Sequence, residues 1–550
     1  MRPRRRVGRD RAKTSDARKR FTRVNTSSAQ LAALLRDRLA LRAWSGWVAS
    51  PGSRCAPLIM AFQELPLRSQ VVLDERSAAH WALGAAIATG TPAFAVCTSG
   101  TAALNYGPAV AEAFYQQVPL LVITADRPAA LIDNGHGQSI RQTRIFDDHL
   151  VGKGLLDCEA PLEWNAAVID QALEALKYGP VHLNVPLAEP LYEAVAPLAA
   201  GSLGVQSSTV EPMPLEIPDF VRHAKRPLLV VGQWNPSWGD PEPAVRELAR
   251  KGWMIAAEPL SQLPHDAAEH LEDTLPMLRA EPDAVVTLGG PWVAKKAKAA
   301  LAGTPHWAIG PREPLPDMFG ALRARTHAEH FAALTALAEL APALGQVFTQ
   351  NQITAKEVVG WSDLKLHSTI AKAIPAGWDV HWANSTPVRY ANFLWGQGRF
   401  SRGIRHFSNR GASGIDGMTS TALGAMWATQ RPTLLVTGEL GFLYDGGAGI
   451  AYEALPALKV LVVNNQGGQI FQWLDGPRAS SQLERHFAFR HARSVRSSAE
   501  NQGFTYRSAR DEAEFRRDWE AFVNDSAATV LEVYTDPDAS ETAWKGRFGA

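Results

Sequence analysis

Two apolar runs in the last quarter of the sequence each stop at polar residues that could bind a metal ion. The stretch LLVTGELG places Glu439 directly after one run, and KVLVVNNQGG places Asn465 after the next. Parallel strands end at one edge of their sheet, and ligands bind beyond that edge. A carboxylate, an amide oxygen and a backbone carbonyl such as that of Gly467 suit Mg²⁺ or Mn²⁺. The pattern therefore predicts a divalent-metal site.

Each motif taken alone has a simpler interpretation. Glu439 could cap a helix, and the Asn464–Asn465 pair could form a turn. Their spacing, on two strands predicted to be neighbours, favours a metal that grips a diphosphate. Glycines 446, 447 and 449 are predicted to begin a helix, where free backbone N–H groups favour phosphate.

The elements that must position these residues alternate between strand and helix along the chain. Such alternation predicts α/β domains with parallel sheets. A representative unit is a strand at 93–100, a helix at 101–117 and a strand at 119–128. Further strands are expected at 179–192, 226–234, 284–292, 306–311, 432–440, 459–467 and 528–536. We predict a disordered basic tail (1–25) followed by three α/β domains at 26–200, 201–347 and 348–550.

Composition narrows the class of protein. Hydrophobic residues make up 46% and charged residues 20%, which fits a globular protein. The first twenty residues hold ten Lys or Arg and two Asp, and the remainder is mildly acidic, which argues against a nucleic-acid binder. The tail has no apolar run, so it does not resemble a secretory signal; it could instead touch anionic surfaces.

Cysteine usage and hydropathy point to the cytoplasm. Cys55, Cys97 and Cys158 are widely spaced and predict neither a disulfide framework nor a zinc site. Residues 81–111 carry no charge and are long enough to span a bilayer. Because glycine and proline break that stretch into helix, strand and helix, we expect buried core rather than stable membrane insertion.

Several longer motifs carry a resemblance to a known family. Taken in order between about residues 45 and 475, they are similar to the MenD family, the 2-succinyl-5-enolpyruvyl-6-hydroxy-3-cyclohexene-1-carboxylate synthases. SPGSR and NRGASGID are more specific than the metal motif, which all thiamine-diphosphate enzymes share. The motifs are VASPGSRCAPL (48–58), LDERSAAHWALG (73–84), CTSGTAALN (97–105), TADRPAALIDNGHGQSIRQ (124–142), NRGASGIDG (409–417) and VVNNQGGQIF (462–471).

The resemblance implies three open parallel-sheet domains of the thiamine-diphosphate-dependent decarboxylase type: pyrimidine-binding, central and diphosphate-binding. The implied cofactors are thiamine diphosphate and Mg²⁺ (or Mn²⁺). The implied activity is that of a transferase of menaquinone biosynthesis. It decarboxylates 2-oxoglutarate and adds the succinyl-semialdehyde carbanion to isochorismate by 1,4-addition. The cofactor would lie between the first domain of one chain and the third domain of another, so a homodimer or a dimer of dimers is expected.

The same resemblance assigns roles to individual residues. Glu75, after the strand-like VVLD, would hydrogen-bond the cofactor aminopyrimidine, and Gln138 would share the catalytic role. Further cofactor contacts are expected at Gly414, Ile415, Gly438, Leu440 and Ile470, and metal ligation at Glu439, Asn465 and Gly467. The 2-oxoglutarate side would use Ser385, Arg389 and Arg410, and Phe471 would be an apolar pocket residue. The isochorismate side would use Ser53, Arg54, Gln138 and Lys295, with Arg127 as a further contact.

The sequence departs from the family pattern at three places. Glu439 stands where the family usually has Asp, and Gly137 replaces an Asn. Gly441 and Gly446–Gly447 replace the usual Ser and Leu-Asn. Two alternatives therefore stay open: another carboligase, of the acetolactate-synthase type, and a cofactor-binding protein with impaired turnover.

Overall fold

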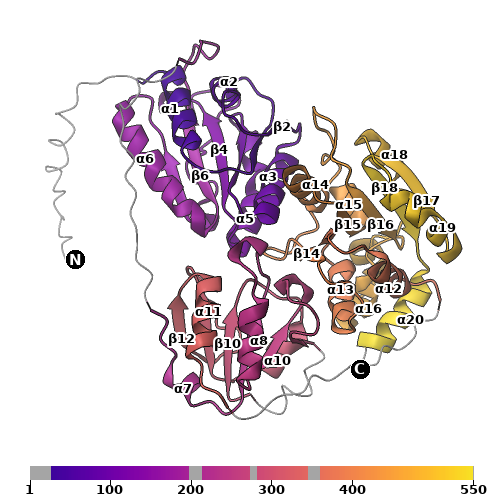
Figure 1. The fold of residues 1–550 in the computed structure, drawn as a ribbon. Coiled ribbons are helices and arrows are strands. Elements are labelled where there is room, and N and C mark those ends of the chain that lie inside the picture. The colour runs from indigo at the N-terminus through magenta and orange to yellow at the C-terminus, as the bar shows by residue number, and fades with distance from the viewer. Residues whose placement is uncertain (1–25, 197–213, 273–281, 345–359, 549–550) are drawn as a thin grey trace, which may run out of the picture.

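Three parallel sheets of six strands each follow one another along the chain (Figure 1). The computed structural model describes residues 26–196, 214–272, 282–344 and 360–548. The predicted α/β class with three open parallel sheets is confirmed. The predicted basic tail and all three predicted domain boundaries lie outside the described residues or at their edges, so they stay predictions.

The first sheet has the strand order β2-β1-β3-β4-β6-β5. Its strands are β1 (Gly46–Ala49), β2 (Ser69–Val71), β3 (Ala93–Cys97), β4 (Leu120–Asp126), β5 (Gly152–Leu155) and β6 (Val181–Pro186). Its helices are α1 (Ser28–Ala40), α2 (Ala56–Phe62), α3 (Glu75–Thr89), α4 (Thr101–Leu104), α5 (Gly107–Gln116) and α6 (Leu162–Ala175). The single helix predicted at 101–117 was wrong, because Pro108 has no N–H for the carbonyl of Leu104.

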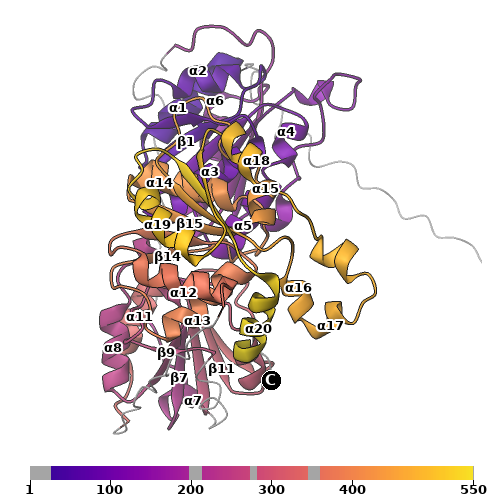
Figure 2. The same cartoon turned by 90° about the vertical axis from the view of Figure 1, so that its right-hand side faces the viewer.

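The central sheet has the order β12-β11-β10-β7-β8-β9. Its strands are β7 (Pro227–Val231), β8 (Met254–Ala257), β9 (Glu269–His270), β10 (Ala284–Leu288), β11 (His306–Gly310) and β12 (Leu322–His327). Its helices are α7 (Asp219–Arg222), α8 (Glu242–Arg250), α10 (Lys295–Ala300) and α11 (His330–Leu340). Figure 2 shows this domain below the other two.

The third sheet, β14-β13-β15-β16-β18-β17, repeats the relative strand order of the first. Its strands are β13 (Asp379–Trp382), β14 (Arg405–Phe407), β15 (Thr433–Gly438), β16 (Lys459–Asn464), β17 (Thr505–Ala509) and β18 (Thr529–Tyr534). Its helices are α12 (Asp363–Ala373), α13 (Thr386–Gly396), α14 (Met418–Thr429), α15 (Glu439–Tyr444), α16 (Ile470–Trp473), α17 (Asp475–Arg478), α18 (Arg496–Asn501), α19 (Glu512–Val523) and α20 (Pro537–Phe548).

Helices α3 and α14 join the first and third domains within one chain (Figure 1). Two glycines permit their close approach. A Cβ on Gly84 would lie 1.9 Å from the carbonyl oxygen of Thr421, and a Cβ on Gly424 would lie 2.0 Å from that of Trp81. The Trp81 indole also donates to the carbonyl of Ala448. Most of the charge-free stretch at 81–111 is buried, as predicted, although Leu104 is 49% exposed. No described helix has the length and hydropathy needed to cross a membrane.

Candidate functional site

A cavity of about 530 Å³ lies beyond the carboxyl ends of β13, β15 and β16, with Lys295 of the central domain on its wall. Most of the residues that the sequence assigned to cofactor, metal and 2-oxoglutarate line it. They are Ser385, Arg389, Arg410, Ile415, Gly438, Glu439, Leu440, Asn465, Gly467, Ile470 and Phe471. Lys295, which the sequence assigned to isochorismate, lines the cavity as well. Gly414 lies just behind them, where its carbonyl accepts a hydrogen bond from Asn384.

Glu439 and Asn465 follow adjacent strands, as their spacing predicted. β15 and β16 pair in parallel, with Gly438 opposite Val463. Glu439 begins α15, but its side chain does not cap that helix. Instead its Oε1 accepts the backbone N–H of Gly467 at 2.7 Å, which ties together the ends of both strands.

The two asparagines at the end of β16 have different roles. Asn464 Oδ1 accepts the N–H of Gln466, so Asn464 does form a turn. Asn465 Nδ2 donates to Asp363 Oδ2 at 2.8 Å, which turns its amide oxygen away from that carboxylate. Burial raises the pKa of Asp363 to about 6. Nothing in the sequence had pointed to Asp363, because its partner is 102 residues away.

The prediction that glycines 446, 447 and 449 begin a helix was wrong. The helix is α15, and it begins at Glu439 and ends at Tyr444, before these glycines. Since a helix leaves its first N–H groups free, a phosphate would meet the start of α15 instead. The glycines serve packing: a Cβ on Gly447 would lie 2.6 Å from the carboxylate of Asp74 in the first domain.

A histidine that the sequence gave no reason to select faces the carboxylate. His491 Nε2 lies 3.2 Å from Glu439 Oε1, and its side chain is 5% exposed. Within the described ranges, no group of three or more His, Cys, Asp or Glu side chains is placed to hold a metal ion. The donors Glu439, Asn465 and Gly467 fit a hard cation that takes its remaining ligands from phosphate oxygens or water.

Two arginines give the cavity a positive wall. Arg389 donates to the carbonyl of Ser385, and Arg410 Nη1 donates to Asn384 Oδ1 at 2.9 Å. Burial lowers the pKa of both guanidinium groups, and Arg410 lowers that of Arg389 further. In the part of the chain that the structure describes, neither forms an ion pair, and the buried Arg410 Nε has no hydrogen-bond partner. This arrangement suits an anionic ligand, because Arg binds carboxylates in a planar, two-point manner.

The residues assigned to isochorismate form a separate cluster in the first domain, apart from Lys295. Arg54 Nη1 donates to the carbonyl of Leu187, and burial followed by the nearby Arg127 lowers its pKa. Arg127 Nε donates to the carbonyl of Gly137, and Ser99 donates to that of Gln138. Ser53 is exposed beside them, after β1.

Glu75 also lies in the first domain. It is the first residue of α3, whose N-terminus is capped by Asp74. Burial is the main cause that raises the pKa of the Glu75 carboxyl. Neither Glu75 nor the cluster around Arg54 lines the cavity that holds Glu439. One chain therefore carries two separate sets of predicted site residues.

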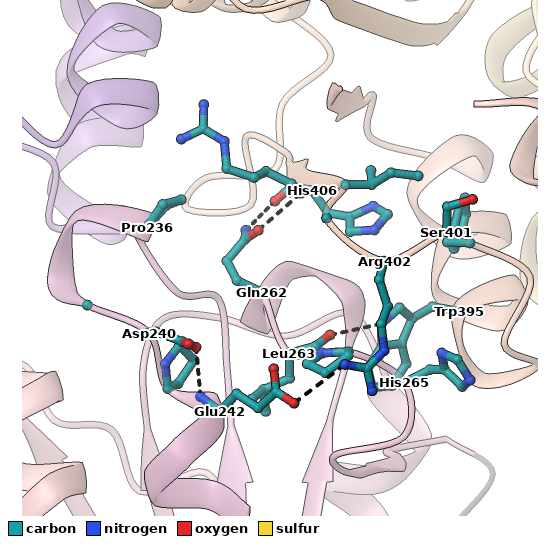
Figure 3. Close-up of a pocket in the computed structure, with 17 residues that line it drawn as sticks. Pro236, Asp240, Glu242, Gln262, Leu263, His265, Trp395, Ser401, Arg402 and His406 are labelled. Atoms are coloured by element: carbon teal, nitrogen blue, oxygen red, sulfur yellow. Dashed lines mark hydrogen bonds and ion pairs between the residues drawn. The ribbon is translucent and has the colours of Figure 1, made fainter. Parts of the chain in front are cut away.

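A second cavity, of about 380 Å³, lies between the central and third domains (Figure 3). Both of its arginines are already paired with carboxylates, Arg405 with Asp379. Arg402 forms ion pairs with Asp266 and Glu242. Gln262 exchanges hydrogen bonds with the backbone of His406. The interactions around this cavity join the central and third domains, and both arginines on its wall are already paired.

Comparison with known proteins agrees with the fold and the motifs. Residues 30–145 match the family described as "Thiamine pyrophosphate enzyme, N-terminal TPP binding domain". A solved structure of a Mycobacterium smegmatis protein, assigned as thiamin diphosphate-dependent, aligns with a TM-score of 0.72 at 18% identity. The alignment covers 93% of this chain and 100% of that one, so it supports the three-domain fold.

Several curated relatives carry the name 2-succinyl-5-enolpyruvyl-6-hydroxy-3-cyclohexene-1-carboxylate synthase. The relative from Flavobacterium johnsoniae is 32% identical, with 91% of this chain and 95% of the relative aligned. That from Flavobacterium psychrophilum is 34% identical, with 89% and 92% aligned. That from Porphyromonas gingivalis is 34% identical, with 89% and 91% aligned. Since these relatives are at least 32% identical over about nine-tenths of both chains, this chain belongs to the 2-succinyl-5-enolpyruvyl-6-hydroxy-3-cyclohexene-1-carboxylate synthase family.

Proposed function

We propose that this protein is a thiamine-diphosphate-dependent transferase of menaquinone biosynthesis. It decarboxylates 2-oxoglutarate and adds the remaining four-carbon unit to isochorismate. The product is 2-succinyl-5-enolpyruvyl-6-hydroxy-3-cyclohexene-1-carboxylate, the compound named in its relatives. The observation that carries this proposal is the cavity itself, where Arg389 and Arg410 form no ion pair with any described residue and line the same wall as Glu439 and Asn465.

Thiamine diphosphate and a divalent cation are the proposed cofactors. When bound, the thiamine group supplies a carbon nucleophile for the keto carbon of 2-oxoglutarate. Glu439, Asn465 and the carbonyl of Gly467 would hold Mg²⁺ or Mn²⁺ against the diphosphate. Gly414, Gly438, Leu440, Ile415 and Ile470 would contact the cofactor, in keeping with their places on or beside the cavity wall.

The substrates divide between the two sets of residues. Ser385, Arg389 and Arg410 would bind the carboxylates of 2-oxoglutarate, with Phe471 as apolar wall. Ser53, Arg54, Arg127, Gln138 and Lys295 would bind isochorismate. Glu75 would hold a proton at the aminopyrimidine ring, a role that its raised pKa supports.

A homodimer, or a dimer of dimers, would bring the two sets together. Glu75 does not line the cavity that holds Glu439 within one chain, and in a dimer a second copy would supply the missing set. An exposed apolar patch beside Glu75 supports this arrangement: Leu73, Tyr444 and Tyr452 are 59%, 53% and 86% exposed. The domain limits 26–200, 201–347 and 348–550 and a cytoplasmic location, which fits three free cysteines, belong to the same proposal.

A choice of keto acids tests the proposal against the acetolactate-synthase alternative. The protein, loaded with thiamine diphosphate and Mg²⁺, should release CO₂ from 2-oxoglutarate and little from pyruvate, because pyruvate has no second carboxylate for the arginine pair. Arg389→Met provides the matched variant, since it keeps side-chain bulk without charge. Equal CO₂ release from both acids would support the alternative carboligase, and cofactor binding without CO₂ release would support a protein with impaired turnover.

A further inference from the structure

Two buried carboxylates outside the cavity each bind the backbone next to one of its cations. Glu112 lies on α5 of the first domain, and Glu258 follows β8 of the central domain. They are 3% and 2% exposed, and neither lines the cavity. Buried carboxylates are costly unless they are hydrogen-bonded, so their partners need an explanation.

Glu112 binds the loop that carries Arg410. Its Oε1 accepts the N–H of Gly411, and its Oε2 accepts the N–H of Ala412, both at 2.7 Å. A Cβ on Gly411 would lie 2.7 Å from the carbonyl oxygen of Glu112, so the loop packs directly on α5. A first-domain carboxylate therefore fixes the backbone beside a third-domain cation.

Glu258 does the same for Lys295. Its Oε2 accepts the N–H of Val293 at 2.6 Å, and its Oε1 accepts that of Ala294 at 2.7 Å. The next residue is Lys295, the first of α10. Glu258 Oε1 also accepts from Asn392 Nδ2 at 3.3 Å, on the helix α13 that carries Arg389.

The two carboxylates also compensate the charge of the cavity wall. Burial lowers the pKa of Arg410, whereas Glu258 and Glu112 raise it. Both carboxylates thus favour the charged form of Arg410, whereas its Nη1 donates to Asn384 and to neither of them. The cations thus stay available to a substrate.

We propose that Glu112 and Glu258 are positioning residues for substrate binding. Glu112 sets the loop that presents Arg410 to 2-oxoglutarate, and Glu258 sets the start of α10 that presents Lys295 to isochorismate. This proposal rests on the function proposed above, which assigns a substrate to each cation.

Glu112→Gln and Glu258→Gln test it, because an amide keeps the shape but leaves one backbone N–H facing an NH₂ group. Losing a charged hydrogen bond should raise KM about tenfold while kcat stays within about twofold. Glu112→Gln should raise KM for 2-oxoglutarate, and Glu258→Gln should raise KM for isochorismate. Asp283→Asn is the matched control: Asp283 accepts the N–H groups of Lys225 and Arg226 at the amino ends of β10 and β7, away from the carboxyl end of β8 that Glu258 follows.

A double-mutant cycle separates positioning from a general structural role. Glu112→Gln should have no further effect on KM in an Arg410→Ala background and its full effect in a Lys295→Ala background. Glu258→Gln should have no further effect on KM in a Lys295→Ala background and its full effect in an Arg410→Ala background. Equal effects in both backgrounds, or a fall in kcat at unchanged KM, would overturn the proposal.

Amide hydrogen exchange gives a readout that needs no substrate. Exchange at Gly411 and Ala412 should quicken in Glu112→Gln, and exchange at Val293 and Ala294 in Glu258→Gln. If Glu112→Gln does not fold, Glu112→Asp replaces it, because the shorter carboxylate keeps the charge and can accept only one of the two backbone N–H groups. If the unaltered protein makes no product, the proposed function fails while exchange still tests the positioning. Unchanged amide exchange at these residues in both Gln variants would refute the positioning role of Glu112 and Glu258.

Discussion

Replacing Glu439 with Asp tests whether this site is adapted to the longer side chain. Glu439 Oε1 accepts the N–H of Gly467 at 2.7 Å and lies 3.2 Å from His491 Nε2. Asp lacks one methylene, so its carboxylate would withdraw by about 1.5 Å, one carbon–carbon bond. The contact with Gly467 would stretch to about 4 Å, beyond hydrogen-bond range.

The magnitude follows from that lost contact. A hydrogen bond to a charged group contributes about 1.5–3 kcal/mol, so Mg²⁺ affinity should fall about ten- to a hundredfold. Activity titrated against Mg²⁺ and against Mn²⁺ measures the change, and Glu500→Asp on the exposed face of α18 is the control. Tighter Mg²⁺ binding in Glu439→Asp would show that Glu is a degenerate ligand. An unchanged titration curve would show that residue 439 does not bind the metal.

Four further predictions address other parts of the account. Glu75→Gln should keep thiamine diphosphate affinity, measured by calorimetry, and nearly abolish CO₂ release; near-normal release would remove Glu75 from its role. Arg54→Ala should leave CO₂ release intact and suppress product formation with isochorismate by about 2–5 kcal/mol in kcat/KM; loss of CO₂ release would refute the split between substrates. Gly84→Ala should lower stability by about 1–3 kcal/mol in denaturant unfolding, because its Cβ would overlap the carbonyl of Thr421; wild-type stability would contradict this packing. Burial lowers the pKa of His330 to about 3. The folded state thus binds fewer protons than the unfolded state, and stability should be full above about pH 6.5 and fall as the pH drops toward 3. As the pH drops, the thermal midpoint should fall less steeply in His330→Gln than in the unaltered protein. Equal slopes in the two proteins would refute this role of His330.

The sheet architecture could be predicted because its signals are local. Strands such as β4 and β16 are continuous apolar runs buried on both faces, and helices separate them in sequence. The break between α4 and α5 was also encoded locally, in Pro108, but was missed. The turn glycines 446, 447 and 449 were assigned to the wrong end of a helix, because α15 begins at Glu439, directly after its N-cap Gly438, and ends before them.

The site could be predicted only where a motif stood beside a strand end. Glu439 and Asn465 were found in this way, whereas Asp363 and His491 were not. Asp363 lies before the sheet in sequence and reaches Asn465 only after folding. Glu112 and Glu258 accept hydrogen bonds from loops in distant segments of the chain. A single buried Glu on a helix or after a strand has no sequence signature that predicts such a contact.

The most direct measurement of the central claim is the identity of the product. The protein is incubated with thiamine diphosphate, Mg²⁺, 2-oxoglutarate and isochorismate, and the mixture is resolved by mass spectrometry. We predict that 2-succinyl-5-enolpyruvyl-6-hydroxy-3-cyclohexene-1-carboxylate forms as isochorismate disappears, and that carbon-labelled 2-oxoglutarate transfers four of its carbons to it. CO₂ release without any adduct of isochorismate would contradict the account.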